Sequence, residues 1–144
     1  MKTAKKTAGF FIVEILVVLL IIGILVTALM PNLTIYTQRA QYVDNLSVAA
    51  AIKPAVEGCL MQNAATTSNC FGGTSGIPAN VSTNLGSFVA SVSVVPNGII
   101  TVTSATKFGN PAGFYTYVLT PSIQSSSGAI TWTNSGTCIN AGLC

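Results

Sequence analysis

The chain opens with a nearly uninterrupted apolar run from Gly9 to Met30, GFFIVEILVVLLIIGILVTALM. As an α-helix rising about 1.5 Å per residue, this run covers roughly 30 Å, the thickness of the hydrocarbon core of a bilayer. The length therefore predicts a membrane-spanning helix. Glu14 interrupts the pattern, and an ionisable side chain inside a membrane segment costs on the order of 2.5 kcal/mol or more, which marks it as a candidate functional residue.

Beyond Pro31 the pattern changes from uniformly apolar to amphipathic. Apolar residues recur at spacings that suit one face of a helix, namely Ile35, Tyr42, Leu46, Ala49, Val56 and Leu60. Polar residues are expected on the other faces, namely Gln38, Arg39, Gln41, Asp44 and Asn45. The spacing predicts that one long helix leaves the membrane, continues over residues 32–58 of a soluble domain and ends near Gly58. Gly23, Pro31 and Pro54 weaken this helix, because glycine has a low helix propensity and proline lacks a backbone donor.

The second half of the chain predicts a loop region followed by a small antiparallel sheet. Residues 59–86 are small and polar without a period, which is typical of a loop. Ser87–Ser104 predicts a hairpin, because apolar residues alternate on both sides of the turn sequence Pro-Asn-Gly. A third strand is predicted at 113–120, ending before a proline, and a fourth at 128–133. Together they complete a four-stranded sheet over 87–133. The amphipathic helix half is the available cover for its apolar face, so the predicted fold class is α+β.

Charged residues are few and unevenly placed. The formal net charge is +3, but Lys2, Lys5 and Lys6 all precede the apolar run. Because the lysine-rich flank of a membrane helix stays in the cytoplasm, the run is expected to cross outward. From residue 10 onward the side-chain charges balance, with Arg39, Lys53 and Lys107 against Glu14, Asp44 and Glu57. This balance argues against strong nucleic-acid binding, which needs clustered basic residues.

The four cysteines all lie beyond the apolar run, at Cys59, Cys70, Cys138 and Cys144. Their even number indicates disulfides in an oxidising compartment. Zinc is disfavoured, because the spacings are not those of paired zinc knuckles and the chain has no histidine. Three connectivities are open to four cysteines, and we predict the local one, Cys59 with Cys70 and Cys138 with Cys144. The absence of histidine and the scarcity of acids also remove most nucleophile–base pairs and metal-ligand sets. We therefore expect a protein that is not an enzyme and holds no metal or cofactor.

Several of these features together resemble one known family. A short basic segment ends in Gly9, FFIVE follows directly, the apolar helix contains Gly23 and Pro31, and YTQRAQ follows at residues 36–41. This series resembles the processing site and N-terminal helix of type IV pilins. In that family a glycine, an aromatic residue and an acid stand at fixed spacing before an apolar run.

The resemblance implies how the N-terminus is processed. Residues 1–9 would be a leader that a prepilin peptidase removes by cutting between Gly9 and Phe10. The same enzyme would N-methylate Phe10, and Glu14 would then be the fifth residue of the mature chain. Cleavage would also remove the three leader lysines.

The resemblance further implies a mode of assembly. Residues 10–31 would anchor the subunit in the inner membrane and then polymerise it into a helical homopolymer outside the cell, with the pilus assembly machinery and its ATPases as partners. Glu14 would set the register by pairing with the amine of Phe10 on an adjacent subunit. The helix between Gly23 and Pro31 would melt locally when subunits pack.

The carboxyl end adds to the resemblance. Residues 128–144, GAITWTNSGTCINAGLC, are similar to the last strand and closing disulfide loop of major pilins, where a tryptophan on that strand precedes the first cysteine. Here Trp132 stands before Cys138, and the loop over 134–144 is small. The resemblance leaves open whether this loop offers a binding surface or only pins the C-terminus.

Other interpretations compete with a major pilin. Val26-Thr27-Ala28 fits a signal-peptide cleavage site, and an ordinary single-pass anchor explains the run but not the glycine–phenylalanine junction. A minor pilin, a type II secretion pseudopilin and a monomeric lipid-anchored module also remain, although the acid-poor domain argues against the calcium loop typical of major pseudopilins. Three Asn-x-Ser/Thr triplets, at Asn32, Asn45 and Asn80, carry no assigned function. Adhesion, twitching motility and DNA uptake are equally compatible with the sequence.

Overall fold

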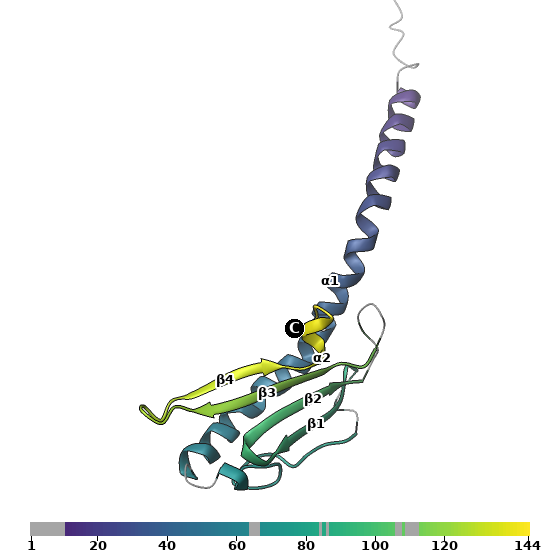
Figure 1. Cartoon of the computed structure of the whole chain (residues 1–144). Coiled ribbons are helices and arrows are strands. Elements are labelled where there is room, and N and C mark those ends of the chain that lie inside the picture. The colour runs from purple at the N-terminus through teal and green to yellow at the C-terminus, as the bar shows by residue number, and fades with distance from the viewer. Residues whose placement is uncertain (1–10, 64–66, 84, 86, 106–107, 109–112) are drawn as a thin grey trace, which may run out of the picture. The chain divides into compact units, whose positions relative to one another are not determined.

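The computed structural model describes residues 11–63, 67–83, 85, 87–105, 108 and 113–144, with the side chains of residues 30–32 left out. The chain divides into two compact units, Met1–Tyr36 and Thr37–Cys144. The second unit is called the head below. The elements in chain order are α1 (Phe11–Gln62), η1 (Thr67–Asn69), β1 (Val89–Val95), η2 (Pro96–Gly98), β2 (Ile99–Ser104), β3 (Thr116–Ile123), β4 (Ile130–Ser135) and α2 (Thr137–Asn140) (Figure 1).

Helix α1 is 52 residues long and belongs to both units. It continues through Pro31 and Pro54, and it ends at Gln62 rather than near Gly58, so the predicted boundary was wrong by one turn. The extra turn forms because Cys59 and Leu60 are buried in the core, which outweighs the roughly 1 kcal/mol propensity cost of a helical glycine. Cys59 therefore lies on the helix and not in the predicted loop region.

The predicted four-stranded antiparallel sheet is confirmed. The strand order is β1-β2-β3-β4, so each strand pairs with the next one along the chain. The first hairpin turns through η2, where Asn97 and Gly98 both have positive φ, 70° and 74°. This matches the Pro-Asn-Gly turn expected from the sequence, because asparagine and glycine are the residues that best tolerate the left-handed region.

Strand β3 differs from its predicted bounds. It runs from Thr116 through Pro121 to Ile123, whereas the sequence predicted a stop before the proline. Its pairing with β2 ends at Leu119, opposite Ile100, while its pairing with β4 continues to Ile123. Pro121 therefore lies beyond the end of β2, where a missing backbone donor breaks no bond to that strand.

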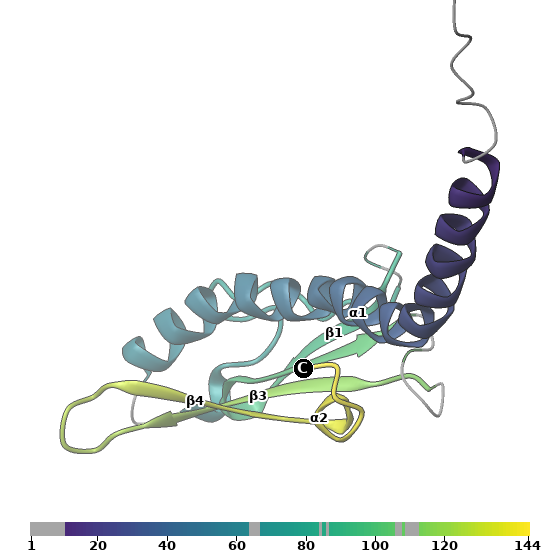
Figure 2. The same ribbon diagram turned by 90° about the horizontal axis from the view of Figure 1, so that it is seen from above.

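The core of the head lies between α1 and the sheet, as predicted. In Figure 2 the part of α1 that belongs to the head runs along one face of the sheet. The largest buried cluster contains Ala49, Val56, Cys59 and Leu60 of the helix together with residues of the sheet and of the segment before it, which are Cys70, Ile77, Val89, Val92, Val94, Ile100, Val102 and Leu119. A second cluster gathers Tyr42, Phe108, Cys138 and Leu143.

Two helix residues do not follow the predicted faces. Ile35 was expected on the apolar stripe but is 49% exposed and lies in the first unit. Asn45 was expected on a polar face, but its side chain is fully buried. The reason is helical geometry, since Asn45 is three residues from Tyr42 and four from Ala49 and so shares their face.

Candidate functional site

The first unit presents an apolar helix whose surface is uncovered. Phe11–Leu29 is long and apolar enough to cross a membrane by length and composition, with a mean hydropathy of 3.1, and none of it is buried within the chain. A helix that is apolar on all sides is stable only when another apolar phase surrounds it. The polar Thr27 fits such a phase, because its hydroxyl donates to the carbonyl oxygen of Ile24 at 2.8 Å.

Glu14 is the one charged residue of this span. It is exposed and stands in the first turn of α1, where the unpaired backbone N–H groups and the helix dipole favour a negative charge. Gly9 and Phe10, the predicted cleavage and methylation residues, lie outside the described residues. The geometry between Phe10 and Glu14 is therefore not part of the described site.

The two residues predicted to loosen the helix both lie inside α1. A β-carbon added at Gly23 would meet no atom within 4 Å, so no neighbour within this chain requires glycine there. The helix assignment also continues through Pro31. Local melting between them belongs to the assembled state and stays a prediction.

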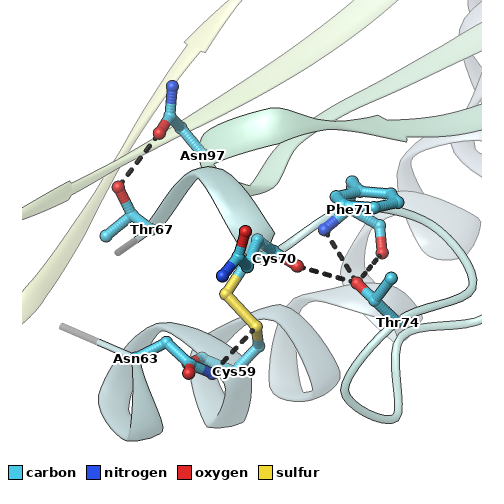
Figure 3. The surroundings of a disulfide bond; sticks show 8 residues. Cys59, Asn63, Thr67, Cys70, Phe71, Thr74 and Asn97 are labelled. Atoms are coloured by element: carbon cyan, nitrogen blue, oxygen red, sulfur yellow. Dashed lines mark hydrogen bonds between the residues drawn. A yellow bond between two sulfur atoms is a disulfide. The ribbon is translucent and has the colours of Figure 1, made fainter. Parts of the chain in front are cut away.

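The first disulfide joins α1 to the segment that leads to the sheet. Cys59 on the helix is bonded to Cys70, which directly follows η1. Figure 3 shows the surroundings of this bond, with the Asn63 side-chain amide close to Cys59. The amide Nδ2 of Asn63 donates to the carbonyl oxygen of Cys59 at 3.1 Å, and the backbone N–H of Asn63 donates to the same oxygen at 2.9 Å, so Asn63 caps the helix end with two bonds. The bond and this cap together fix where the chain leaves α1.

The second disulfide closes a small loop at the C-terminus. Cys138 and Cys144 are bonded, so the pairing in the structure is the local one of the three connectivities. The loop is tied to α1, since Arg39 Nε donates to the carbonyl oxygen of Gly142 at 2.6 Å. It is also tied to the sheet, because the hydroxyl of Thr137 accepts from the backbone N–H of Thr116 at 2.9 Å. These contacts show that the loop is pinned at several points.

Trp132 fastens the last strand to the helix. Its indole Nε1 donates to the Glu57 carboxylate at 2.7 Å, and the Lys53 ammonium lies 5.1 Å from the centroid of its ring. All three side chains are half-buried, so both interactions are only partly screened by water. Neither this contact nor that of Arg39 is predicted from the sequence, although Arg39 stands in the YTQRAQ segment and Trp132 belongs to the C-terminal motif.

Two buried polar side chains of α1 have no hydrogen-bond partner among the described residues, Tyr42 through its hydroxyl and Asn45 through both amide atoms. The pKa of Tyr42 is raised to about 12, mainly by burial and to a smaller extent by the nearby Tyr117. Burial also raises the pKa of Tyr117. In both cases the cause is that the phenolate loses its hydration in the interior.

The described residues contain no candidate metal-binding group, and one of the predicted glycan-acceptor triplets is buried. No group of three His, Cys, Asp or Glu in the described ranges could hold a metal ion. Asn45 is fully buried, and the side-chain oxygen of Asn80 accepts from the backbone N–H of Val94 at 2.7 Å. The Asn45 triplet is therefore poorly placed for modification of the folded head, whereas Asn80 is exposed.

Comparison with known proteins adds a separate line of evidence. The family profile described as pilin, a bacterial filament protein, matches residues 38–142. Over 128 residues the chain is 29% identical to the prepilin peptidase-dependent protein D of Escherichia coli strain K12, which covers 89% of this chain and 82% of that protein. It is 33% identical over 74 residues to the type IV pilus subunit protein TapA of Aeromonas hydrophila, covering 51% of each chain. It is 34% identical over 105 residues to a fimbrial protein of Neisseria meningitidis, covering 73% of this chain and 58% of that one.

Proposed function

The chain belongs to the pilin family, as a type IV pilin, and from this premise we propose that it is the structural subunit of a type IV pilus that polymerises through its apolar helix. The observation that carries the proposal is the span Phe11–Leu29, which is apolar apart from Glu14 and Thr27 and has no buried residue within its own chain. The family profile matches residues 38–142, so the family assignment and the apolar span are independent observations. The family is structural, which favours a role without catalysis.

Cohesion in the filament would come from burial of the apolar span. Leu16 and Leu20 are 61% and 60% exposed, and the residues around them are similarly uncovered. Lipid covers such a surface before assembly, and neighbouring copies of the span would cover it afterwards. Each Å² kept from water contributes about 25 cal/mol, which is large in sum but has no preferred register.

Register would come from Glu14 and the N-terminal amine. In the proposed filament the carboxylate of Glu14 pairs with the amine of Phe10 on an adjacent subunit. The support is that Glu14 is exposed and is the one charge in the span. A carboxylate that is moved from water into an apolar bundle needs an opposite charge, because an unpaired buried charge is strongly destabilising.

Processing would create that amine. A prepilin peptidase would cut between Gly9 and Phe10 and N-methylate Phe10, and removal of Lys2, Lys5 and Lys6 would release the subunit from its cytoplasmic charge anchor. The support is the motif around Gly9 together with the similarity to an E. coli protein named for its dependence on prepilin peptidase. The subunit would reside in the inner membrane before the assembly machinery and its ATPases lift it into an extracellular fibre.

The test compares filament yield with processing. In Glu14→Ala and Glu14→Gln cells, we expect normal cleavage and membrane insertion but no sheared surface fibre. Leu16→Ala is the matched control, because it trims a neighbouring exposed side chain without touching the charge, and it should still give fibres. Normal fibres from the Glu14→Gln cells would refute the proposed ion pair between Glu14 and the amine of Phe10. Intact mass of the sheared protein should begin at N-methylated Phe10, and Gly9→Val should leave the leader attached.

The flexibility of the helix can be tested at Gly23. A methyl group there has free space within the chain and raises helix propensity by about 1 kcal/mol. If the helix must open between Gly23 and Pro31 when subunits pack, Gly23→Ala should lower fibre yield while the membrane pool stays unchanged. Equal fibre yields in wild type and variant would show that opening at Gly23 is not needed.

A further inference from the structure

The turn between β1 and β2 contains the dipeptide Asn97-Gly98, which is chemically labile in flexible chains. There the backbone nitrogen of the glycine attacks the side-chain carbonyl carbon (Cγ) of the asparagine. The bond from Cγ to the amide nitrogen breaks, ammonia leaves and a succinimide ring forms, which water then opens to aspartate or isoaspartate. Glycine favours this reaction because it has no side chain to hinder the approach, and asparagine is accordingly a thermolabile residue.

In the folded head both reacting groups are held apart. The backbone of Asn97 has φ 70° and ψ 13°, so the Gly98 nitrogen is turned toward the Asn97 nitrogen and away from the side chain. The Gly98 N–H donates to the carbonyl oxygen of Cys70 at 2.9 Å. The side-chain oxygen of Asn97 accepts from the hydroxyl of Thr67 at 3.0 Å, as Figure 3 shows. The nucleophile and the carbon that it would attack are thus fixed by separate hydrogen bonds.

The frame that holds this turn is anchored to α1. Cys70, which accepts from Gly98, is bonded to Cys59 on the helix. Gly98 itself is buried, and a β-carbon there would lie 2.6 Å from Cγ1 of Val56. The turn is therefore packed closely against the helix.

Exclusion of water does not explain the protection. Asn97 is exposed, and together with Thr67 it lines a cavity of about 550 Å³. Water can reach the side chain throughout, so geometry is the barrier that remains. A reaction that needs the turn to open proceeds at a rate proportional to the open fraction, which the local stability sets.

We infer that Asn97 is a latent deamidation site, held unreactive by the geometry of the folded turn and made reactive when the Cys59–Cys70 bond is lost and the turn opens. Conversion would add a negative charge to a subunit whose side-chain charges otherwise balance after residue 9. Isoaspartate would also lengthen the backbone by one methylene between Val95 and Ile99, which are paired across this turn. A subunit that had once opened there would therefore be marked irreversibly and would refold poorly.

The experiment incubates the full chain in detergent at mildly alkaline pH and measures deamidation by peptide mass spectrometry. The incubation is carried out in heavy-oxygen water, so that conversion during the incubation carries the label and conversion during later handling does not. Asn134, which is exposed and followed by Ser135, serves as the internal reference. In the oxidised native protein Asn97 should convert no faster than Asn134. In the reduced and denatured chain Asn97 should convert at least about tenfold faster than the reference. Equal ratios in the two states would overturn the inference.

Two variants test the individual contacts in the native state. Thr67→Val removes the hydrogen bond to Asn97 and should raise its native deamidation rate about fivefold, the effect of one hydrogen bond on an opening equilibrium. Thr133→Val, an exposed threonine on β4, is the matched control and should leave the rate unchanged. Cys59→Ala combined with Cys70→Ala should raise the rate further, with fluorescence of Trp132 checking that the head still folds. If Thr67→Val and the cysteine double variant both matched the control, the turn would not be the protecting element.

Discussion

Replacing Tyr42 by phenylalanine should stabilise the head, because it removes one oxygen that the interior leaves without a partner. The Tyr42 ring is fully buried and packs edge-on against Phe108, with centroids 5.6 Å apart, but its hydroxyl makes no hydrogen bond. In the unfolded chain the same hydroxyl is hydrated, so folding carries the cost of stripping that water. An unsatisfied buried polar group costs roughly 1–3 kcal/mol, while the ring contacts survive in Tyr42→Phe. We expect a gain of about 1 kcal/mol, which corresponds to roughly 4–8 °C in Tm for a domain near 100 residues.

The same substitution should change the alkaline limb of the stability curve. Unfolded Tyr42 ionises near its ordinary pKa of 10.0, whereas burial and the neighbouring Tyr117 raise its pKa in the folded head to about 12. The unfolded chain therefore releases this proton first, so the contribution is fully present below pH 10 and is lost as the pH rises toward 12. At 1.36 kcal/mol for each pKa unit, the loss across this window is roughly 2–3 kcal/mol. Tyr42→Phe should remove this loss of stability, and any dependence of stability on pH that remains between pH 10 and 12 would come from groups such as Tyr117.

The assay is thermal unfolding of the full chain in detergent, followed at pH 7 and at steps from pH 9 to 12. Trp132 is the one tryptophan of the sequence, so its fluorescence reports the head without interference from the substitution. A drop in Tm of Tyr42→Phe at pH 7 would refute the reasoning, because it would mean that the hydroxyl has a partner such as an enclosed water. An unchanged slope above pH 10 would refute the assignment of the alkaline loss to Tyr42.

Three more substitutions test other contacts of the head by the same thermal unfolding, followed by circular dichroism where Trp132 is changed. Gly136→Ala should cost roughly 2–4 kcal/mol, because φ is 119° and the added carbon would collide with the backbone oxygen of Thr116, which cannot turn aside. Trp132→Phe should cost roughly 1–2 kcal/mol through loss of the hydrogen bond to Glu57, and an unchanged Tm would show that water replaces it fully. Asn45→Leu should stabilise by roughly 1–3 kcal/mol, since both amide atoms are buried without partners; a lower Tm would show that the amide is satisfied after all.

The parts of the fold that the sequence predicted well are those set by short-range signals. The first hairpin follows from alternating residues around Asn97 and Gly98, whose positive φ the turn requires. The helix follows from spacing that places Ala49 and Val56 on one face. Predictions failed where a local rule met a tertiary contact. The helix continues beyond Gly58 because Cys59 and Leu60 are buried. Strand β3 continues beyond Pro121 because its pairing with β2 ends at Leu119.

The contacts that the sequence could not predict join residues far apart in the chain. Arg39 reaches a carbonyl 103 positions away, and Trp132 reaches Glu57 across 75 positions. A solvated arginine and one tied to a distant carbonyl look the same in a sequence, because the partner is backbone and carries no residue type. The prediction for Asn45 failed for a different reason. Its polar side chain indicated an exposed face, although its spacing from Tyr42 and Ala49 places it on the buried one.

Glu14 differs from both groups, because in the proposed filament its partner lies in another molecule. The chain folds the head around its own core, yet it leaves a 19-residue apolar span with no buried residue and a single acid in the first turn. Nothing in the part of the chain that the structure describes compensates either feature, and apolar surface of that extent is stable only in lipid or against other copies. Lipid satisfies the apolar side chains but not a carboxylate, whereas in the proposed filament the end of a neighbouring chain would supply a positive amine. In this proposal the acid favours assembly over permanent anchoring, which is why Glu14→Gln, a change of charge with little change of shape, is the most discriminating variant of the span.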